Sequence, residues 1–213
     1  MLSQMNPSVD PNIMPWPQEL NQRDRSDFVT VASFQCTYNY IPDSTVGENY
    51  NVGSVRSSQS IPCNCLIYYF EMKVLSQGEK GSIGIGITPN GSRVDRMPGW
   101  EDGTIGYHGD DGSFFHQTGY GADYGPKFSR GDVVGCGIVI EDGKVFFTKN
   151  GTFLGMAPSS FPKDIFHVRY PTIGLHSKHE AVEVNFGQEP FVFDISNVWS
   201  PISNSIIATT GKS

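Results

Sequence analysis

The chain has 213 residues, of which 38% are hydrophobic and 17% charged, and its formal net charge is −7. Glycine (24) and proline (14) are frequent, which argues against long helices and coiled coils, because a helix interior tolerates these two residues worst. The acidic balance also argues against a surface that neutralises nucleic-acid phosphates. One all-β domain with a single core is therefore expected.

Residues 1–20 carry four prolines among small and polar side chains and have no regular hydrophobic period, so a disordered leader is expected there. They lack the basic start and apolar stretch of a secretion signal, and no run of 18 apolar residues occurs anywhere. A cytoplasmic or nuclear protein without membrane contact is expected. Residues 197–213 are rich in serine and threonine and are predicted to be a second tail.

Alternation of apolar and polar residues predicts strands at 67–74, 82–88 and 133–140. In the last two segments glycines occupy one face of the strand, where another layer of the protein could approach closely. Those glycines are Gly84, Gly86, Gly135 and Gly137.

Two turn dipeptides, Asp142-Gly143 and Asn150-Gly151, separate apolar runs at hairpin spacing. Further strands are predicted at 28–32, 36–40, 105–107, 113–116, 172–176, 181–186 and 191–194. About a dozen short antiparallel strands are typical of a β-sandwich.

Eight collinear motifs then suggest a family. They are YYFEMKV (68–74), GSIGIGIT (81–88), PGW (98–100), GYHGDDG (106–112), YGPKFSRGDVVGCGI (124–138), FFTKNG (146–151), YPTIGLHS (170–177) and VNFGQEPFVFDI (184–195). Together they resemble the SPRY domain, most closely the version in the family of the Ran-binding protein of the microtubule-organising centre. The resemblance implies a bent, concanavalin-like sandwich of two antiparallel sheets over residues 21–196.

The resemblance also implies a function. SPRY domains are non-catalytic modules that bind a short peptide or loop of another protein through loops at one end of the sandwich. The expected role is an adaptor or substrate receptor, with ubiquitin-ligase components as an open alternative among its partners. A monomer without metal or cofactor is expected.

By motif position, the resemblance implies a partner-binding surface on three stretches. The residues are Arg56, Thr88, Arg93, Arg96, Met97, Trp100, His176, Ser177, Lys178 and His179. The arginines would donate charge-assisted hydrogen bonds to a carboxylate of the partner, and the basic stretch 176–179 would suit acidic residues. Two alternatives stay open: Trp100 as a structural wedge between the sheets, and Arg56 as a solvated loop residue.

Two other classes of function compete. Trp100 with Asn90 and Arg93 could form a minimal glycan-binding set. An enzyme would have to use His108, Asp110 and Asp111, but Asp111-Gly112 predicts a turn, which favours carboxylates that cap backbone N–H groups and a hydrogen-bonded histidine.

The four cysteines are predicted to be reduced thiols. Cys63 and Cys65 would share one face of a strand, but no second cysteine or histidine pair completes the four ligands of a zinc site.

Overall fold

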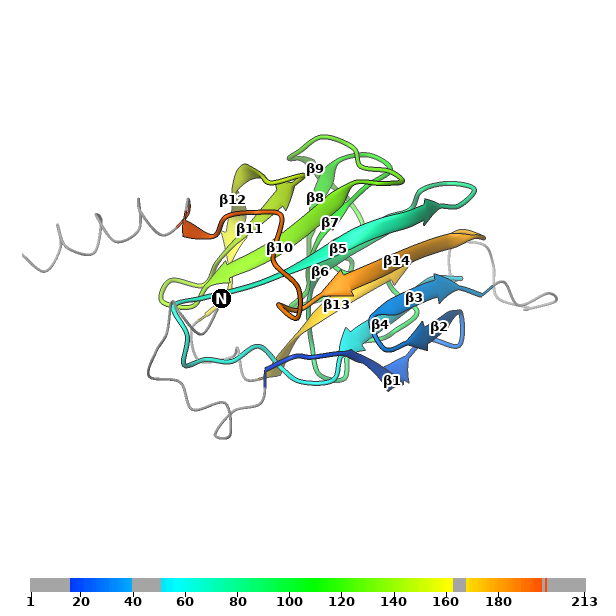
Figure 1. The fold of residues 1–213 in the computed structure, drawn as a ribbon, viewed down its shortest axis with the longest axis horizontal. Coiled ribbons are helices and arrows are strands. Elements are labelled where there is room, and N and C mark those ends of the chain that lie inside the picture. Colours follow the sequence, from blue (N-terminus) through cyan, green and yellow to red (C-terminus); the bar gives the residue numbers. More distant parts are fainter. Residues whose placement is uncertain (1–15, 40–50, 163–167, 197, 199–213) are drawn as a thin grey trace, which may run out of the picture.

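The computed structural model describes residues 16–39, 51–162, 168–196 and 198, which form two stacked antiparallel sheets of seven strands each (Figure 1). The first sheet contains β1 (Leu20–Arg25), β4 (Gly53–Ser57), β13 (Arg169–Leu175), β6 (Ile83–Pro89), β7 (Ile105–His108), β8 (Ser113–His116) and β9 (Ala122–Asp123), in that spatial order. The second contains β12 (Thr152–Ser160), β11 (Lys144–Lys149), β10 (Val133–Val139), β5 (Ile67–Gln77), β14 (Glu180–Asn185), β3 (Gln35–Tyr38) and β2 (Val29–Ala32). The expected all-β sandwich is confirmed.

The main core lies between the sheets and follows the predicted alternation. On β5, Phe70 and Met72 point inward and are completely buried, and Ile85 of β6 and Cys136 of β10 belong to the same cluster. Because successive side chains of a strand point to opposite faces, each of these strands also presents an outer face, turned away from the other sheet.

The glycines on the outer face of the first sheet make room for a loop. A Cβ atom on Gly106 would lie 2.6 Å from the carbonyl carbon of Pro98 and closer still to its oxygen. A Cβ on Gly84 would lie 2.9 Å from the terminal methyl of Met97. The layer that approaches this glycine face is therefore the segment between β6 and β7, and the second sheet packs on the isoleucine face instead.

The outer face of the second sheet is covered in part by residues 186–196, which we call the C-terminal strap. Phe193 and Ile195 of the strap pack with Tyr69 and Phe146 in a second buried cluster. The buried carboxylate of Glu71 accepts the backbone N–H groups of Val192 and Phe193, at 3.0 and 2.9 Å. The predicted strand at 191–194 was wrong, because these N–H groups bond to a side chain instead of a neighbouring strand.

The packed part of the chain begins before the predicted boundary at residue 20. The ring of Trp16 lies 6.0 Å from that of Tyr68, and Leu20 of β1 is 2% exposed. At the other end Val198 is buried in the same cluster as Phe193 and Ile195, so packing extends beyond residue 196. Residues 1–15 of the predicted leader and residues 197 and 199–213 of the predicted tail lie outside the described residues.

The two neighbouring cysteines lie in different environments. Cys65 is buried, donates its thiol to the carbonyl of Pro62, and has a pKa raised by burial to about 12. Cys63 is exposed, and both residues precede β5. The expectation that they share one face of a strand was wrong, because this segment is a turn.

Candidate functional site

The loop between β6 and β7, residues 90–104, folds back over the outer face of the first sheet. The backbone N–H of Ser54 donates to the carbonyl of Val94 at 2.8 Å, and the Ser54 hydroxyl donates to that of Arg96 at 2.5 Å. Met97 is 2% exposed because its side chain fills the space above Gly84. Most of this β6–β7 loop is therefore fixed to the sheet beneath it.

Arg56 is the residue that ties the start of the loop to the sheet. The sequence placed it in a loop, but it lies on β4 and is only 3% exposed. Its guanidinium donates to both carboxylate oxygens of Asp24, at 2.6 and 2.8 Å, and to the backbone carbonyl of Ser92 at 2.8 Å. A buried arginine with these partners holds the start of the loop from below.

Thr88 belongs to the same buried network. It is 5% exposed, its hydroxyl lies 2.8 Å from that of Thr172, and it accepts a longer hydrogen bond of 3.3 Å from Arg56. Thr88 and Arg56 are therefore neighbours, and both side chains are buried.

The two other arginines of the predicted surface lie on either side of Asp95. Arg93 is 55% exposed and forms a two-pronged ion pair with Asp95, at 2.8 and 2.5 Å. This hydrogen bonding is the main reason that the pKa of Asp95 lies below its ordinary value. The Arg96 guanidinium is 3.9 Å from the same carboxylate. Both arginines therefore already have a carboxylate beside them.

The β13–β14 loop, residues 176–179, is organised by a buried carboxylate. Glu180 accepts the backbone N–H groups of His176 and Ser177, at 2.6 and 2.9 Å, and the Ser177 hydroxyl at 2.5 Å. Burial nevertheless raises the pKa of Glu180 above its ordinary value. Ser177 is buried, whereas His179 is exposed and has a left-handed backbone, with φ of 69°. This rigid turn presents the His179 side chain to solvent.

Trp100 connects the two loops. Its ring lies 6.0 Å from that of His176, edge to face, and 6.1 Å from that of His108. Trp100 is half-buried over the outer face of the first sheet, so the alternative of a wedge between the sheets was wrong. Beside it the β6–β7 loop borders a shallow, open hollow of about 550 Å³, whose lining includes Arg93, Trp100 and Glu101.

The candidate acid–base cluster does not converge. His108 is 3% exposed and its Nε2 lies 2.9 Å from the carbonyl oxygen of Pro98. Asp111 accepts the backbone N–H of Ser113 within the turn, as expected, whereas Asp110 accepts a side-chain hydroxyl, that of Ser82 at 3.2 Å. These groups therefore hold the β7–β8 turn and the loop above it.

His108 makes the fold sensitive to acid. Burial lowers the pKa of His108 below its ordinary value of 6.5, whereas the unfolded chain takes up the proton at that value. The unfolded state therefore binds more protons below pH 6.5, and stability falls as the pH decreases through this range. Urea denaturation measures the free energy of unfolding at about pH 7.5 and about pH 5.5. The decrease in this free energy between the two pH values should be larger for the wild type than for His108→Gln. The half-buried His116 is present in both proteins, so its contribution cancels in the comparison. An equal decrease in the free energy of unfolding would therefore contradict the role assigned to His108.

Comparisons with known proteins support a common family. A family model described as the SPRY domain matches residues 67–189. Ran-binding protein 10 of Danio rerio is 38% identical over 211 residues, covering 97% of this chain and 34% of that protein. Ran-binding protein 9 of Homo sapiens is 39% identical over 196 residues, covering 92% and 26%. The Ran-binding protein M homolog of Arabidopsis thaliana is 42% identical over 180 residues, covering 84% and 37%. The chain thus spans only 26% to 37% of the length of these relatives.

Solved structures of SPRY domains have a similar fold. A crystal structure of a human SPRY domain has a TM-score of 0.65 and 27% identity, covering 78% of this chain and 99% of that one. The SPRY domain of human HERC1 has a TM-score of 0.61, covering 80% and 99%, and at 16% identity it supports the fold alone. The part of the chain that the structure describes contains no helix long and apolar enough to cross a membrane.

Proposed function

Because the chain belongs to the SPRY domain family, we propose that it is a non-catalytic module that binds a short peptide or loop of a partner protein, as an adaptor or substrate receptor. The observation that carries the proposal is the meeting of the β6–β7 and β13–β14 loops at Trp100 and His176, beside an open hollow of about 550 Å³. The two loops are fixed to the sheet from below, so the surface is pre-organised, which lowers the entropic cost of binding.

The residues implied by the resemblance divide into two groups by burial. Those that reach the surface are Arg93, Arg96, Trp100, His176, Lys178 and His179, and these would contact the partner. Those that are buried are Arg56, Thr88, Met97 and Ser177, and these would hold the loops in place. Trp and Arg at the centre of a surface are the residue types that most often dominate interface energetics.

The charge of the surface points to a mixed ligand. Arg93 has Asp95 as a partner, and Glu101 and Asp102 line the same hollow. A purely acidic peptide would be repelled by these carboxylates at the β6–β7 loop. At the β13–β14 loop it would be attracted by Lys178 and His179. We therefore propose a ligand that combines apolar groups for Trp100 with polar groups of both kinds.

A phage-displayed library of random dodecapeptides, panned on the whole chain, provides the test. Selected peptides should lose at least about tenfold in affinity on Arg93→Glu and on His179→Glu, because both place a carboxylate inside the contact surface. Lys144→Glu is the matched charge reversal on the second sheet, where Lys144 is 54% exposed, and should leave the affinity unchanged.

Two results would count against this proposal. One is a panel of selected peptides whose affinity neither loop variant alters. The other is a glycan array that gives a clear signal, lost in a folded Trp100→Ala protein, together with no peptide selection.

A further inference from the structure

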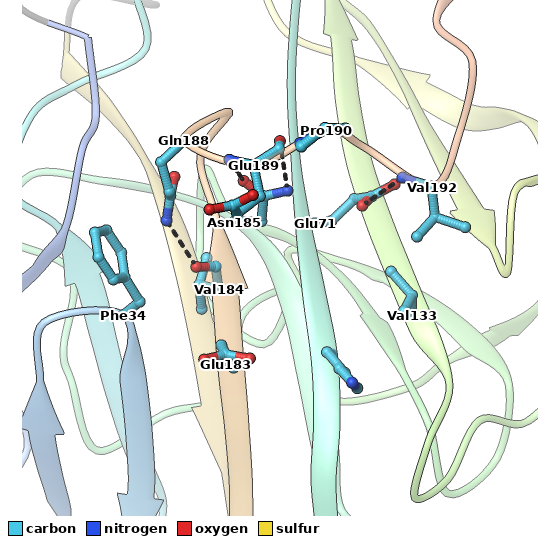
Figure 2. A pocket seen from close by; sticks show the side chains of 11 residues that line it. Phe34, Glu71, Val133, Glu183, Val184, Asn185, Gln188, Glu189, Pro190 and Val192 are labelled. Atoms are coloured by element: carbon cyan, nitrogen blue, oxygen red, sulfur yellow. Dashed lines mark hydrogen bonds between the residues drawn. The ribbon is translucent and has the colours of Figure 1, made fainter.

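The outer face of the second sheet contains a hollow that the loop site does not use. It has a volume of about 350 Å³ and lies between the C-terminal strap and the β2–β3 turn (Figure 2). Figure 2 shows Phe34 at one side, Val133 at the other, and the strap residues Gln188 to Val192 crossing above. Because ligand pockets usually measure about 300–1,000 Å³, this one is large enough for one or two side chains of a partner.

The floor of the hollow is a cross-strand row of the sheet. Lys73 of β5 lies opposite Val133 of β10 on one side and opposite Glu183 of β14 on the other. All three side chains alternate with inward-facing core residues, so they point away from the main core. Phe34 and Val133 are half-buried and Val192 is 55% exposed, so the walls offer apolar surface to an incoming group.

The charges around this floor are predominantly negative. The carboxylates of Glu71, Glu183 and Glu189 line the hollow, against the single ammonium of Lys73. Glu71 is occupied by the strap N–H groups. Glu183 accepts only the neutral side-chain amide of Gln35, at 3.0 Å, and among the described residues no ion pair involves Glu183, Glu189 or Lys73.

A carboxylate that accepts one neutral hydrogen bond retains capacity for a charged donor. An arginine side chain matches this site, because its aliphatic stem can lie on the apolar walls while its guanidinium donates to carboxylates. We propose that this hollow is a second docking site, which takes an arginine flanked by apolar residues from an extended segment of a partner protein.

The position of the hollow separates this proposal from the loop site. The β6–β7 loop covers the outer face of the first sheet, whereas the hollow lies on the outer face of the second. The main core separates the two faces, so one partner on each could be bound at the same time. Substitutions at one site should leave binding at the other unchanged.

The test uses the peptide acetyl-Leu-Arg-Leu-amide and the whole ¹⁵N-labelled chain. In a titration followed by amide chemical shifts, the shifts should concentrate on Lys73, Val133, Glu183 and strap residues 188–192. Replacing arginine with citrulline, which keeps the shape and removes the charge, should weaken binding by about tenfold. The double variant Glu183→Gln with Glu189→Gln should have a similar effect.

Lys73→Gln should have the opposite effect on binding of the arginine peptide. It removes the competing ammonium and should strengthen binding of the arginine peptide by about threefold, a gain that damage to the fold would not produce. Thermal melts of these surface variants check that each is folded. Arg93→Glu should leave the titration unaltered.

Three outcomes would overturn the proposal. The arginine peptide could produce no shifts at the hollow, the citrulline peptide could bind as well as the arginine peptide, or acetyl-Leu-Glu-Leu-amide could bind better through Lys73. None of these outcomes bears on the loop site, whose test uses different peptides and variants.

Discussion

Arg56→Met should lower the free energy of unfolding by about 3 kcal/mol, because the acceptors around the buried guanidinium lose their hydrogen-bond donor. The groups that lose hydrogen bonds are both oxygens of Asp24, the carbonyl of Ser92 and the hydroxyl of Thr88. Methionine retains much of the apolar stem, so the effect reports the guanidinium and not a cavity. Urea denaturation followed by circular dichroism measures the change.

Arg93→Met is the matched control. Arg93 also pairs bidentately with an aspartate, but it is 55% exposed, so its loss should change stability by no more than about 0.5 kcal/mol. Asp24→Asn should cost about 1 kcal/mol, because Asp24 is 31% exposed and water can replace part of the interaction. Equal unfolding midpoints for Arg56→Met and Arg93→Met would show that Arg56 does not hold the loop.

Gly106→Ala should destabilise the protein by about 3 kcal/mol and displace the β6–β7 loop, since the added methyl group would overlap backbone that has little room to move. The Cβ atom would lie 2.6 Å from the carbonyl carbon of Pro98. Hydrogen exchange should therefore increase at the backbone N–H of Ser54, which donates to Val94 of the same loop.

Gly119→Ala provides the control for this substitution. No atom lies within 4 Å of a Cβ built on Gly119, so the alanine meets open space. Stability should stay the same or rise slightly, by up to about 1 kcal/mol, because alanine restricts the unfolded chain. If Gly106→Ala behaves like Gly119→Ala, the loop does not depend on the bare glycine face.

The sequence predicts the strands whose two faces carry different kinds of residue, and it misses strands that lack this alternation. Segments 67–74 and 133–140 alternate clearly, and both are strands. In contrast, β4 reads GSVRS and is buried at all five positions, so no apolar–polar alternation reveals it. The strand predicted at 191–194 has suitable composition, yet the Glu71 carboxylate accepts its N–H groups. A hydrogen bond to a residue far away in the sequence leaves no pattern in the local sequence.

For the candidate site, motif position identified which stretches approach one another, but not which side chains reach the surface. Trp100 and His176 are far apart in sequence and lie close in space, as the resemblance implied. The resemblance placed Arg56 in a surface loop, whereas it lies on β4 and is buried. Its partner, Asp24, lies on β1, and the sequence gives no indication that these two strands pair.

The hydrogen bonds from Asp24 through Arg56 to Ser92 link an edge strand to the loop of the proposed binding surface. In the first sheet β1 pairs with β4 alone, so it is a strand that can detach without breaking any other ladder. Detachment of β1 would remove Asp24 from the guanidinium of Arg56, which would then hold the β6–β7 loop less firmly. If detachment of β1 lowers the affinity of the proposed peptide site, then by thermodynamic linkage a peptide bound there must stabilise the pairing of β1 with β4 by the same factor.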